Sequence, residues 1–339
     1  MLAAARLVGD VQLMDGAMEA IMGINGECGE ASKALLKAKA EFRLARASES
    51  RKLEAASRCW VAHALRLCGK AEEALQQAEQ ARELLASVDD RRGAVATWRE
   101  TAACLEDLGR KAEAVEFCHE AAREHRQMGD TPGAAQALQF AIDTCAQRDD
   151  GASALRAAFE QRKLYLEAGY KEEEAATLLR ISELVMKMKG VDSALKAVRE
   201  ARFIFQAMAD REGEAGALLT GANLQIEARR CEGAVKAARE AQQLCRTADS
   251  RRLEADALLT GARALLVKGE RAMAELGSEE RGLREGLLAA ARGCYEALDD
   301  AEGLAATLQL AVRCHVLAGD GAGGLRAAWD ALELCELLE

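Results

Sequence analysis

The sequence predicts an all-α solenoid built from stacked helical hairpins. Three observations support this fold class. The 339-residue chain contains one proline and 4% aromatic residues, a composition that favours helices over β-sandwiches. Its sequence repeats every 40 residues. Within each repeat, apolar residues recur at spacings of three and four, which is typical of amphipathic helices, and no segment shows the alternation of a strand.

The repeat divides the chain into eight units that form one domain, residues 1–339. Their predicted bounds are 11–50, 51–90, 91–130, 131–170, 171–210, 211–250, 251–300 and 301–339. Seven units carry a small residue in one column of their second half: Ala34, Ala74, Ala114, Ala154, Ala194, Ala234 and Gly324. A single hairpin cannot bury its apolar face, so we expect neighbouring hairpins to stack through these small residues.

The unit 211–250 illustrates how each hairpin is predicted. Leu218, Ala222 and Ile226 mark the apolar face of a first helix, and Ala234 and Ala238 mark that of a second. A glycine column supplies the turn between the helices, since glycine tolerates positive φ: Gly69, Gly109, Gly269 and Gly319, with Gly190 one place later. Units end in polar residues that can cap the next helix: Asp89-Asp90, Asp130, Asp210, Asp249 and Asp299-Asp300.

The last two units depart from this pattern. The unit 251–300 holds ten extra residues near 271–280, which we interpret either as an interaction loop or as an extension of the flanking helices. The final turn is apolar, with Leu332, Leu334, Cys335, Leu337 and Leu338. Because solenoid ends need a polar cap, we expect a longer chain or a second subunit to cover this end.

Charge and cysteine usage indicate a soluble, intracellular protein. The net charge of −10 argues against nucleic acid and anionic membranes as partners. Eleven scattered cysteines form no CxxC pair, and most stand in columns of small apolar residues, so we expect reduced core thiols and a reducing, cytoplasmic location. No segment approaches the roughly 20 apolar residues of a membrane span.

Residue patterns for catalysis, metal or cofactor are missing from the sequence. Of the four histidines, His119 and His315 each follow a cysteine directly, and adjacent residues on a helix point in different directions. The segment GDGAGG, 319–324, lacks the lysine and the preceding strand of a phosphate loop. We therefore predict a protein that is not an enzyme and that holds no cofactor and no metal.

The columns resemble the tetratricopeptide repeat (TPR) family, in the 40-residue variety found in Pins-type adaptors and kinesin light chains. In the unit 211–250 the family's large position falls on Leu218, and its middle pair falls on Gly221 and Ala222. The three positions of its second helix fall on Ala234, Ala238 and Ala241. This resemblance implies a right-handed superhelical solenoid of about eight hairpins that binds a protein partner. The first helices would line a groove for an extended peptide or an amphipathic helix.

The resemblance also implies which residues line that groove. The most informative column contains His63, Ala103, Asp143, Glu183, Asn223, Arg263 and Arg313. Asn223 stands at a position similar to that of an asparagine that holds peptide backbone in Pins-type repeats. Arg263 and Arg313 would meet carboxylates. Asp143 and Glu183 would meet basic groups. The alternative is that this column is simply the solvated face of an amphipathic helix.

Two further columns are implied to line the groove. One contains Cys59, Arg99, Gln139, Leu179, Leu219, Leu259 and Gln309, and the other contains Arg66, Glu106, Ala146, Met186, Ile226, Leu266 and Val316. Both become apolar toward the C-terminal half. They form either an exposed apolar strip that marks a partner site or ordinary core between repeats.

The sequence thus favours a non-catalytic interaction adaptor or scaffold that binds a partner segment in its groove. The alternative is a permanent structural subunit of a larger complex. Such a subunit would use the C-terminal end and the 271–280 insertion as contact surfaces, with a larger apolar interface than a reversible adaptor has.

Overall fold

Helices account for nearly all of the described chain. The structure, a computed structural model, describes residues 11–272 and 277–338, and no strand occurs in them. Two compact units divide between Ala168 and Gly169. The first unit contains α2 (Val11–Glu27), α3 (Ala31–Ala47), α4 (Arg51–Leu67), α5 (Ala71–Ser87), α6 (Arg91–Ala96), α7 (Trp98–Asp107), α8 (Lys111–Gln127), α9 (Thr131–Gln147) and α10 (Gly151–Ala168). The second contains α11 (Lys171–Lys189), α12 (Val191–Ala207), α13 (Arg211–Glu227), α14 (Cys231–Ala248), α15 (Arg251–Ala272), α16 (Ser278–Leu298), α17 (Ala301–Leu317) and α18 (Gly321–Leu338).

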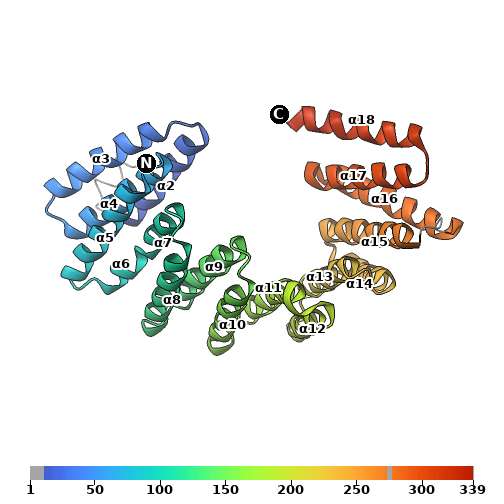
Figure 1. Cartoon of the computed structure of the whole chain (residues 1–339), viewed down its shortest axis with the longest axis horizontal. Coiled ribbons are helices and arrows are strands. Elements are labelled where there is room, and N and C mark those ends of the chain that lie inside the picture. Colours follow the sequence, from blue (N-terminus) through green and yellow to red (C-terminus); the bar gives the residue numbers. More distant parts are fainter. Residues whose placement is uncertain (1–10, 273–276, 339) are drawn as a thin grey trace. The chain divides into compact units, whose positions relative to one another are not determined.

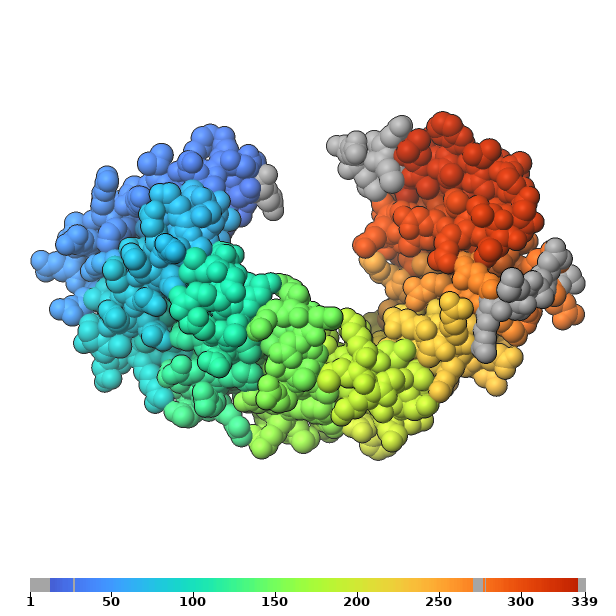
Figure 2. Space-filling view, viewed as in Figure 1, coloured from blue at the N-terminus to red at the C-terminus, as the bar shows by residue number. Residues whose placement is uncertain are grey.

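Consecutive helices pack as hairpins within each unit, which confirms the all-α class (Figure 1). The first helices of successive hairpins also contact one another: α13 with α15 and α15 with α17 in the second unit, and α2 with α4 and α4 with α7 in the first. The space-filling view shows the outer surface of these packed helices (Figure 2). The single continuous solenoid over residues 1–339 stays a prediction.

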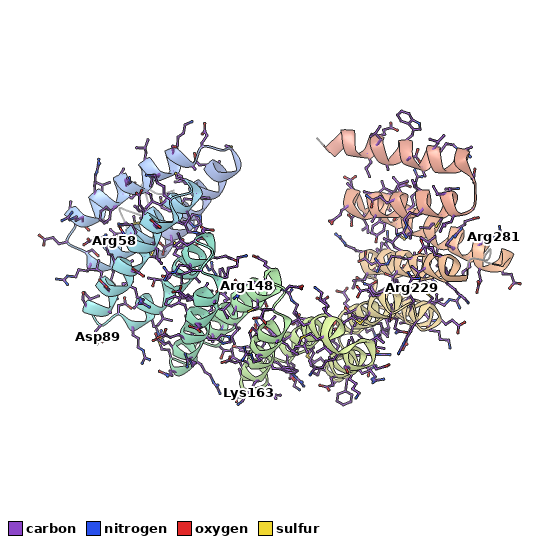
Figure 3. The ribbon with its side chains drawn as sticks, in the orientation of Figure 1. Arg58, Asp89, Arg148, Lys163, Arg229 and Arg281 are labelled. Atoms are coloured by element: carbon purple, nitrogen blue, oxygen red, sulfur yellow. The ribbon has the colours of Figure 1, made fainter. Side chains whose placement is uncertain are left out.

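The turns between helices use left-handed backbone, as the glycine column predicts. Gly69, Gly109 and Gly319 have φ of 71°, 73° and 70°, and each follows the last residues of a helix. Asp89 adopts the same conformation, with φ of 57°, between α5 and α6 (Figure 3). Gly269 does not form a turn, so the prediction for it is wrong. It lies inside α15, which continues to Ala272.

The ten extra residues lengthen the helices around them. α15 has 22 residues and α16 has 21, whereas α13 and α17 have 17 each. For the described part of the insertion, helix extension is therefore the interpretation that holds. Residues 273–276 lie outside the described residues, so the interaction role of the insertion stays a hypothesis.

Aspartates cap several first helices, as predicted. Asp130 Oδ1 accepts a hydrogen bond from Gly133 N at 3.0 Å, and Asp210 Oδ1 accepts one from Gly213 N at 2.9 Å. Asp300 does the same for Gly303 N at 3.1 Å. These bonds satisfy backbone donors that the first turn of a helix leaves free. Asp249 is an exception to the predicted role, because with φ of 56° it ends α14 rather than capping α15.

The capping bonds predict a loss of stability in acid. The backbone of Gly133 lowers the pKa of Asp130, and that of Ser153 lowers the pKa of Asp150. A lowered pKa stabilises the fold fully above the unfolded value of about 3.9, and this contribution disappears as the pH falls through the folded-state value. We expect the double variant Asp130→Asn, Asp150→Asn to lose less stability than wild type between about pH 5 and pH 3, measured as urea midpoints. Equal losses would contradict this linkage.

A side chain from the preceding helix covers the glycine in each of these caps. A Cβ atom at Gly133 would lie 2.4 Å from His125 Nδ1, and one at Gly213 would lie 2.3 Å from Phe205 Cδ1. His125 Nδ1 also lies 2.8 Å from Asp130 Oδ2. In these D-x-x-G caps, the aspartate accepts a hydrogen bond from a backbone N–H that the helix leaves free. The glycine lets a ring pack directly on the helix backbone.

Small residues fill the positions where helices approach most closely. Ala34, Ala74, Ala114, Ala154, Ala194 and Ala234 are all fully buried, as their column predicts. Allowing for the ten-residue insertion, Arg284 of α16 occupies this same column. Its side chain is only 4% exposed, and its Nε has no hydrogen-bond partner. The unit 251–300, which has the longer helices, therefore also carries an arginine in a column that otherwise holds alanine or glycine.

The cysteines whose side chains are described are free thiols. Cys104, Cys118, Cys145, Cys231, Cys245 and Cys314 are buried, in agreement with the core role predicted for most of them. Burial raises the pKa of Cys104 and of Cys118 to about 12, so both remain protonated at neutral pH. Among the described residues, no helix combines the length and apolar character that crossing a bilayer requires.

Candidate functional site

Three first helices of the second unit enclose a groove of about 530 Å³. Its walls come from α13, α15 and α17, and each helix contributes the same four columns of the repeat. These columns are Gly216, Asp256 and Ala306; Leu219, Leu259 and Gln309; Thr220, Thr260 and Leu310; and Asn223, Arg263 and Arg313, to which Leu253 adds one more wall residue. Spacings of three and four place the four residues of each helix on one face, so one surface runs across all three helices.

The floor of the groove is apolar. Leu219 is 7% exposed and packs against Leu218 and Ala215 of its own helix and Ala257 of α15. Leu310 of α17 is also buried. Leu253 and Leu259 are half-buried, so part of each side chain faces the groove. These leucines give the site apolar surface that a ligand could cover.

Two guanidinium groups lie at the rim. Arg263 Nη2 donates a hydrogen bond to Asn223 Oδ1 at 2.5 Å, and Arg313 Nη2 donates one to Glu270 Oε1 at 2.7 Å. The side chains of Arg263 and Arg313 are both exposed to solvent. Surface pairs of this kind contribute little stability, so a carboxylate ligand could replace the present partners at small cost.

A partly buried hydrogen bond joins α15 to α16 next to the groove. The hydroxyl of Tyr295, on α16, donates to Asp256 Oδ1 at 2.5 Å. Burial raises the pKa of Tyr295, and the bond to Asp256 raises it further. The hydroxyl therefore stays protonated and keeps donating over the whole physiological pH range. Because Asp256 lines the groove, this bond connects the shape of the site to the packing of α15 on α16.

Four of the ten predicted binding residues meet in this groove: Leu219, Asn223, Arg263 and Arg313. Ile226 does not. It is 7% exposed and packs with Ala222, Ala234 and Ala264 in the core between hairpins. Glu183 lies exposed on α11, outside the groove walls.

The predicted residues of the first unit lie in charge networks on α4, α7 and α9. His63 Nδ1 lies 3.1 Å from Glu100 Oε1, and Arg66 Nε donates to Asp107 Oδ2 at 2.7 Å. The pKa of Arg66 is raised, since Asp107 and Glu100 outweigh the opposing effect of its partial burial. In the same unit, Arg99 Nη2 donates to Gln136 Oε1 at 3.1 Å, and Gln139 Nε2 donates to both carboxylate oxygens of Asp143 at 3.1 Å. A binding role for these four residues stays a prediction.

Half of the predicted apolar strip is buried, and the other half, Leu179, Met186 and Leu259, is half-buried. Leu266 is fully buried, and Ile226 and Leu219 are 7% exposed, so the idea of an exposed strip is wrong for them. Each of these side chains faces the neighbouring first helix, because successive first helices pack on one another. Of the six residues of this strip, Leu219 and Leu259 line the groove.

Sequence reasoning missed several groove residues, among them Thr220, Leu253, Asp256 and Thr260. A signal for three of them was present. Thr220 lies three residues before Asn223 and one after Leu219, and Thr260 holds the equivalent place before Arg263. Asp256 lies seven residues before Arg263, two helical turns away. Residues at these spacings share one helix face. Leu253 could not be placed in this way, because it contributes from the first turn of α15.

The sequence matches no known protein family, and no curated protein matches it. Solved structures do match. A signal-transduction ATPase (STAND) from Pyrococcus horikoshii, described as having a tetratricopeptide repeat sensor, covers 87% of this chain with 18% identity and a TM-score of 0.53. This chain spans 44% of the length of that protein. The apo quorum sensor NprR from B. thuringiensis covers 96% of this chain, which in turn covers 88% of NprR, with 13% identity and a TM-score of 0.49.

At such low identity, the likeness to the ATPase concerns the fold alone. It agrees with what the chain itself presents: consecutive helical hairpins, alanine columns at the close contacts, and left-handed turns between helices. This chain therefore has the tetratricopeptide-like helical-repeat fold.

Proposed function

We propose that this protein is a non-catalytic interaction module that binds a segment of a partner protein in the groove formed by α13, α15 and α17. One observation carries the proposal: the same four columns of three helices place an apolar floor and two exposed guanidinium groups on one surface. The apolar floor suits hydrophobic side chains of the ligand. Arg263 and Arg313 suit an acidic side chain or a terminal carboxylate.

The groove also offers polar groups to the backbone of an extended peptide. Asn223 offers a donor and an acceptor to a peptide backbone once its bond to Arg263 is exchanged. The affinity of a reversible adaptor lies near the micromolar range, or about −8 kcal/mol. The residues at the rim would set which acidic segment is preferred, and the leucines would supply most of the binding energy.

Selection from a random peptide library tests the proposal. We expect peptides selected on the wild-type protein to contain apolar and acidic residues. Their Kd should rise at least about tenfold, or 1.4 kcal/mol, in the double variant Asn223→Ala, Arg263→Glu, as measured by calorimetry. The matched control is Gln243→Ala, Arg239→Glu, which makes the same charge change on exposed residues of α14.

The control variant should bind like wild type, and both variants should keep the helical circular dichroism signal. If the Asn223→Ala, Arg263→Glu variant binds the selected peptides as tightly as wild type does, the groove is not the site. If both variants lose binding equally, a general charge effect is responsible, and the assignment to the groove also fails.

A permanent structural subunit is the second candidate, and exposed apolar residues on the last hairpin favour it. Trp329 is 68% exposed, Leu325 is 65% exposed, and Leu332 and Val316 are also exposed. Large exposed aromatic and aliphatic groups on neighbouring turns are typical of protein contacts. A permanent subunit would copurify with its partner whether or not the groove is altered, so the same two variants separate the candidates.

A further inference from the structure

The first unit contains a second cavity, of about 360 Å³, that the proposed function does not use. It lies between the second helices α5 and α8, with α6 and the start of α7 as its floor. Its apolar walls are Ala86, Ala94, Val95, Trp98, Phe117 and Ala121. The volume is enough for one large side chain and falls at the low end of the range for ligand pockets.

A break in a first helix lies at this cavity, and residues on both sides of the break line it. α6 ends at Ala96 and α7 begins at Trp98, whereas the other first helices in the described residues run without a break. At the break, Thr97 Oγ1 donates to Ala94 O at 2.7 Å, and Thr101 Oγ1 donates to Thr97 O at 3.3 Å. Both hydroxyls thus bond to carbonyls of the preceding turn at the break.

A carboxylate replaces an apolar residue at the cavity wall. Glu124 belongs to a column that is otherwise apolar: Leu44, Leu84, Leu164, Ile204, Leu244, Cys294 and Leu334. In the following hairpin, Leu164 is buried at this position. Glu124 puts a negative charge beside the apolar surface of the cavity.

The charged side chains around the cavity differ in whether they already contact another side chain. Arg82 lies over the ring of Phe117, 5.2 Å from its centroid, and Arg91 donates to Gln127 Oε1 at 2.7 Å. Glu120 and Glu124 stand one turn apart on α8 and line the cavity, and within the described chain neither carboxylate has a hydrogen bond or an ion pair. The cavity therefore combines an apolar interior with the carboxylates of Asp89, Glu120 and Glu124 and the guanidinium groups of Arg82 and Arg91.

We propose that this cavity docks an amphipathic helix of a partner protein. One aliphatic or aromatic side chain of that helix enters the space beside Trp98. A lysine or arginine one turn away pairs with Glu120 and Glu124. A glutamate at that position of the helix would instead face Glu120 and Glu124, so we expect this surface to favour a basic helix over an acidic one.

Two synthetic peptides test this docking surface. Both are alanine-based helices with one leucine, followed four positions later by arginine in one peptide and by glutamate in the other. We follow the indole signal of Trp98 by NMR during titration of the full-length protein. The arginine peptide should shift this signal, and the glutamate peptide should bind at least about tenfold more weakly.

Two variants assign the effect to the cavity. Glu124→Leu restores the apolar column and should abolish the shift, and Glu116→Leu changes an exposed residue of the same helix and should leave it intact. Equal binding of both peptides, no shift with either, or unchanged binding to Glu124→Leu would overturn the proposal. Phenethylammonium serves as a third probe: if it alone shifts the signal, the cavity is a small-amine site and the docked helix is wrong.

The result is independent of the groove on α13, α15 and α17. That groove lies in the second unit, and none of its walls comes from α5, α6 or α8. Loss of peptide binding at one surface therefore leaves the test of the other surface unaffected.

Discussion

The substitution Gly303→Ala is expected to lower the free energy of unfolding by about 3 kcal/mol. A Cβ atom at this position would lie 2.3 Å from two ring carbons of Tyr295, where there is no room for it. Tyr295 is only 1% exposed, and its hydroxyl is bonded to Asp256, so the ring cannot move aside without breaking this partly buried hydrogen bond. Urea unfolding followed by circular dichroism measures the loss.

Gly293→Ala provides the control within the same hairpin. Gly293 lies on the exposed face of α16, and a Cβ there would meet no atom within 4 Å. Because alanine is the better helix former, this variant should gain about 0.5–1 kcal/mol. Similar losses in both variants would show that the contact of Tyr295 with the cap does not hold this hairpin together.

The substitution Arg284→Met is expected to raise the free energy of unfolding by about 2 kcal/mol. Arg284 is only 4% exposed, and its Nε lacks a hydrogen-bond partner. Its charge acts on Cys314, whose pKa is raised by burial and lowered by Arg284. Burying a guanidinium whose Nε makes no hydrogen bond is costly, and methionine keeps much of the side-chain volume without the charge.

Arg292→Met is the matched control on α16. Arg292 is half exposed and pairs with Glu296 at 2.7 Å and with Asp330 at 3.0 Å. Exposed pairs contribute little, so this change should stay within about 0.5 kcal/mol. A loss of stability in Arg284→Met would mean that the guanidinium is paired in solution, and the explanation given for its burial would then be wrong.

The hairpins and their close contacts could be predicted from the sequence. The column from Ala34 to Ala234 is fully buried, and Asp130 and Asp210 cap the helices that follow them. Both features depend on residues close together in the chain or repeated at a fixed period. Local chemistry of this kind is specified by the residue type alone, because only small side chains allow close packing and only short polar ones cap.

The helix ends around the insertion were predicted less well. Gly269 fits the turn column but lies inside α15, because ten added residues let the helix continue past it. Glycine permits a turn without requiring one, so the surrounding chain decides. The break at Thr97 could not be predicted either, since threonines at similar positions, such as Thr220 and Thr307, donate to the preceding turn within unbroken helices.

Helix and repeat geometry explain why only part of the candidate site could be predicted. Asn223, Arg263 and Arg313 were placed correctly on one surface, because residues 40 or 50 positions apart occupy equivalent places in successive hairpins. Ile226 was assigned to the groove, although it faces the core. It lies three residues after Asn223, and one residue of a helix turns the face by about 100°, so a small error in rotation exchanges groove and core positions.

The location of the bound segment tests the central claim most directly. A peptide selected on the wild-type protein and carrying a benzophenone group can be cross-linked by light, and the attached residues can be identified by mass spectrometry. We expect cross-links on the groove faces of α13, α15 and α17, with Leu259 and Gln309 among the attached residues. Cross-links concentrated on α14 and α16, or on the first unit, would contradict the assignment of the groove as the binding site.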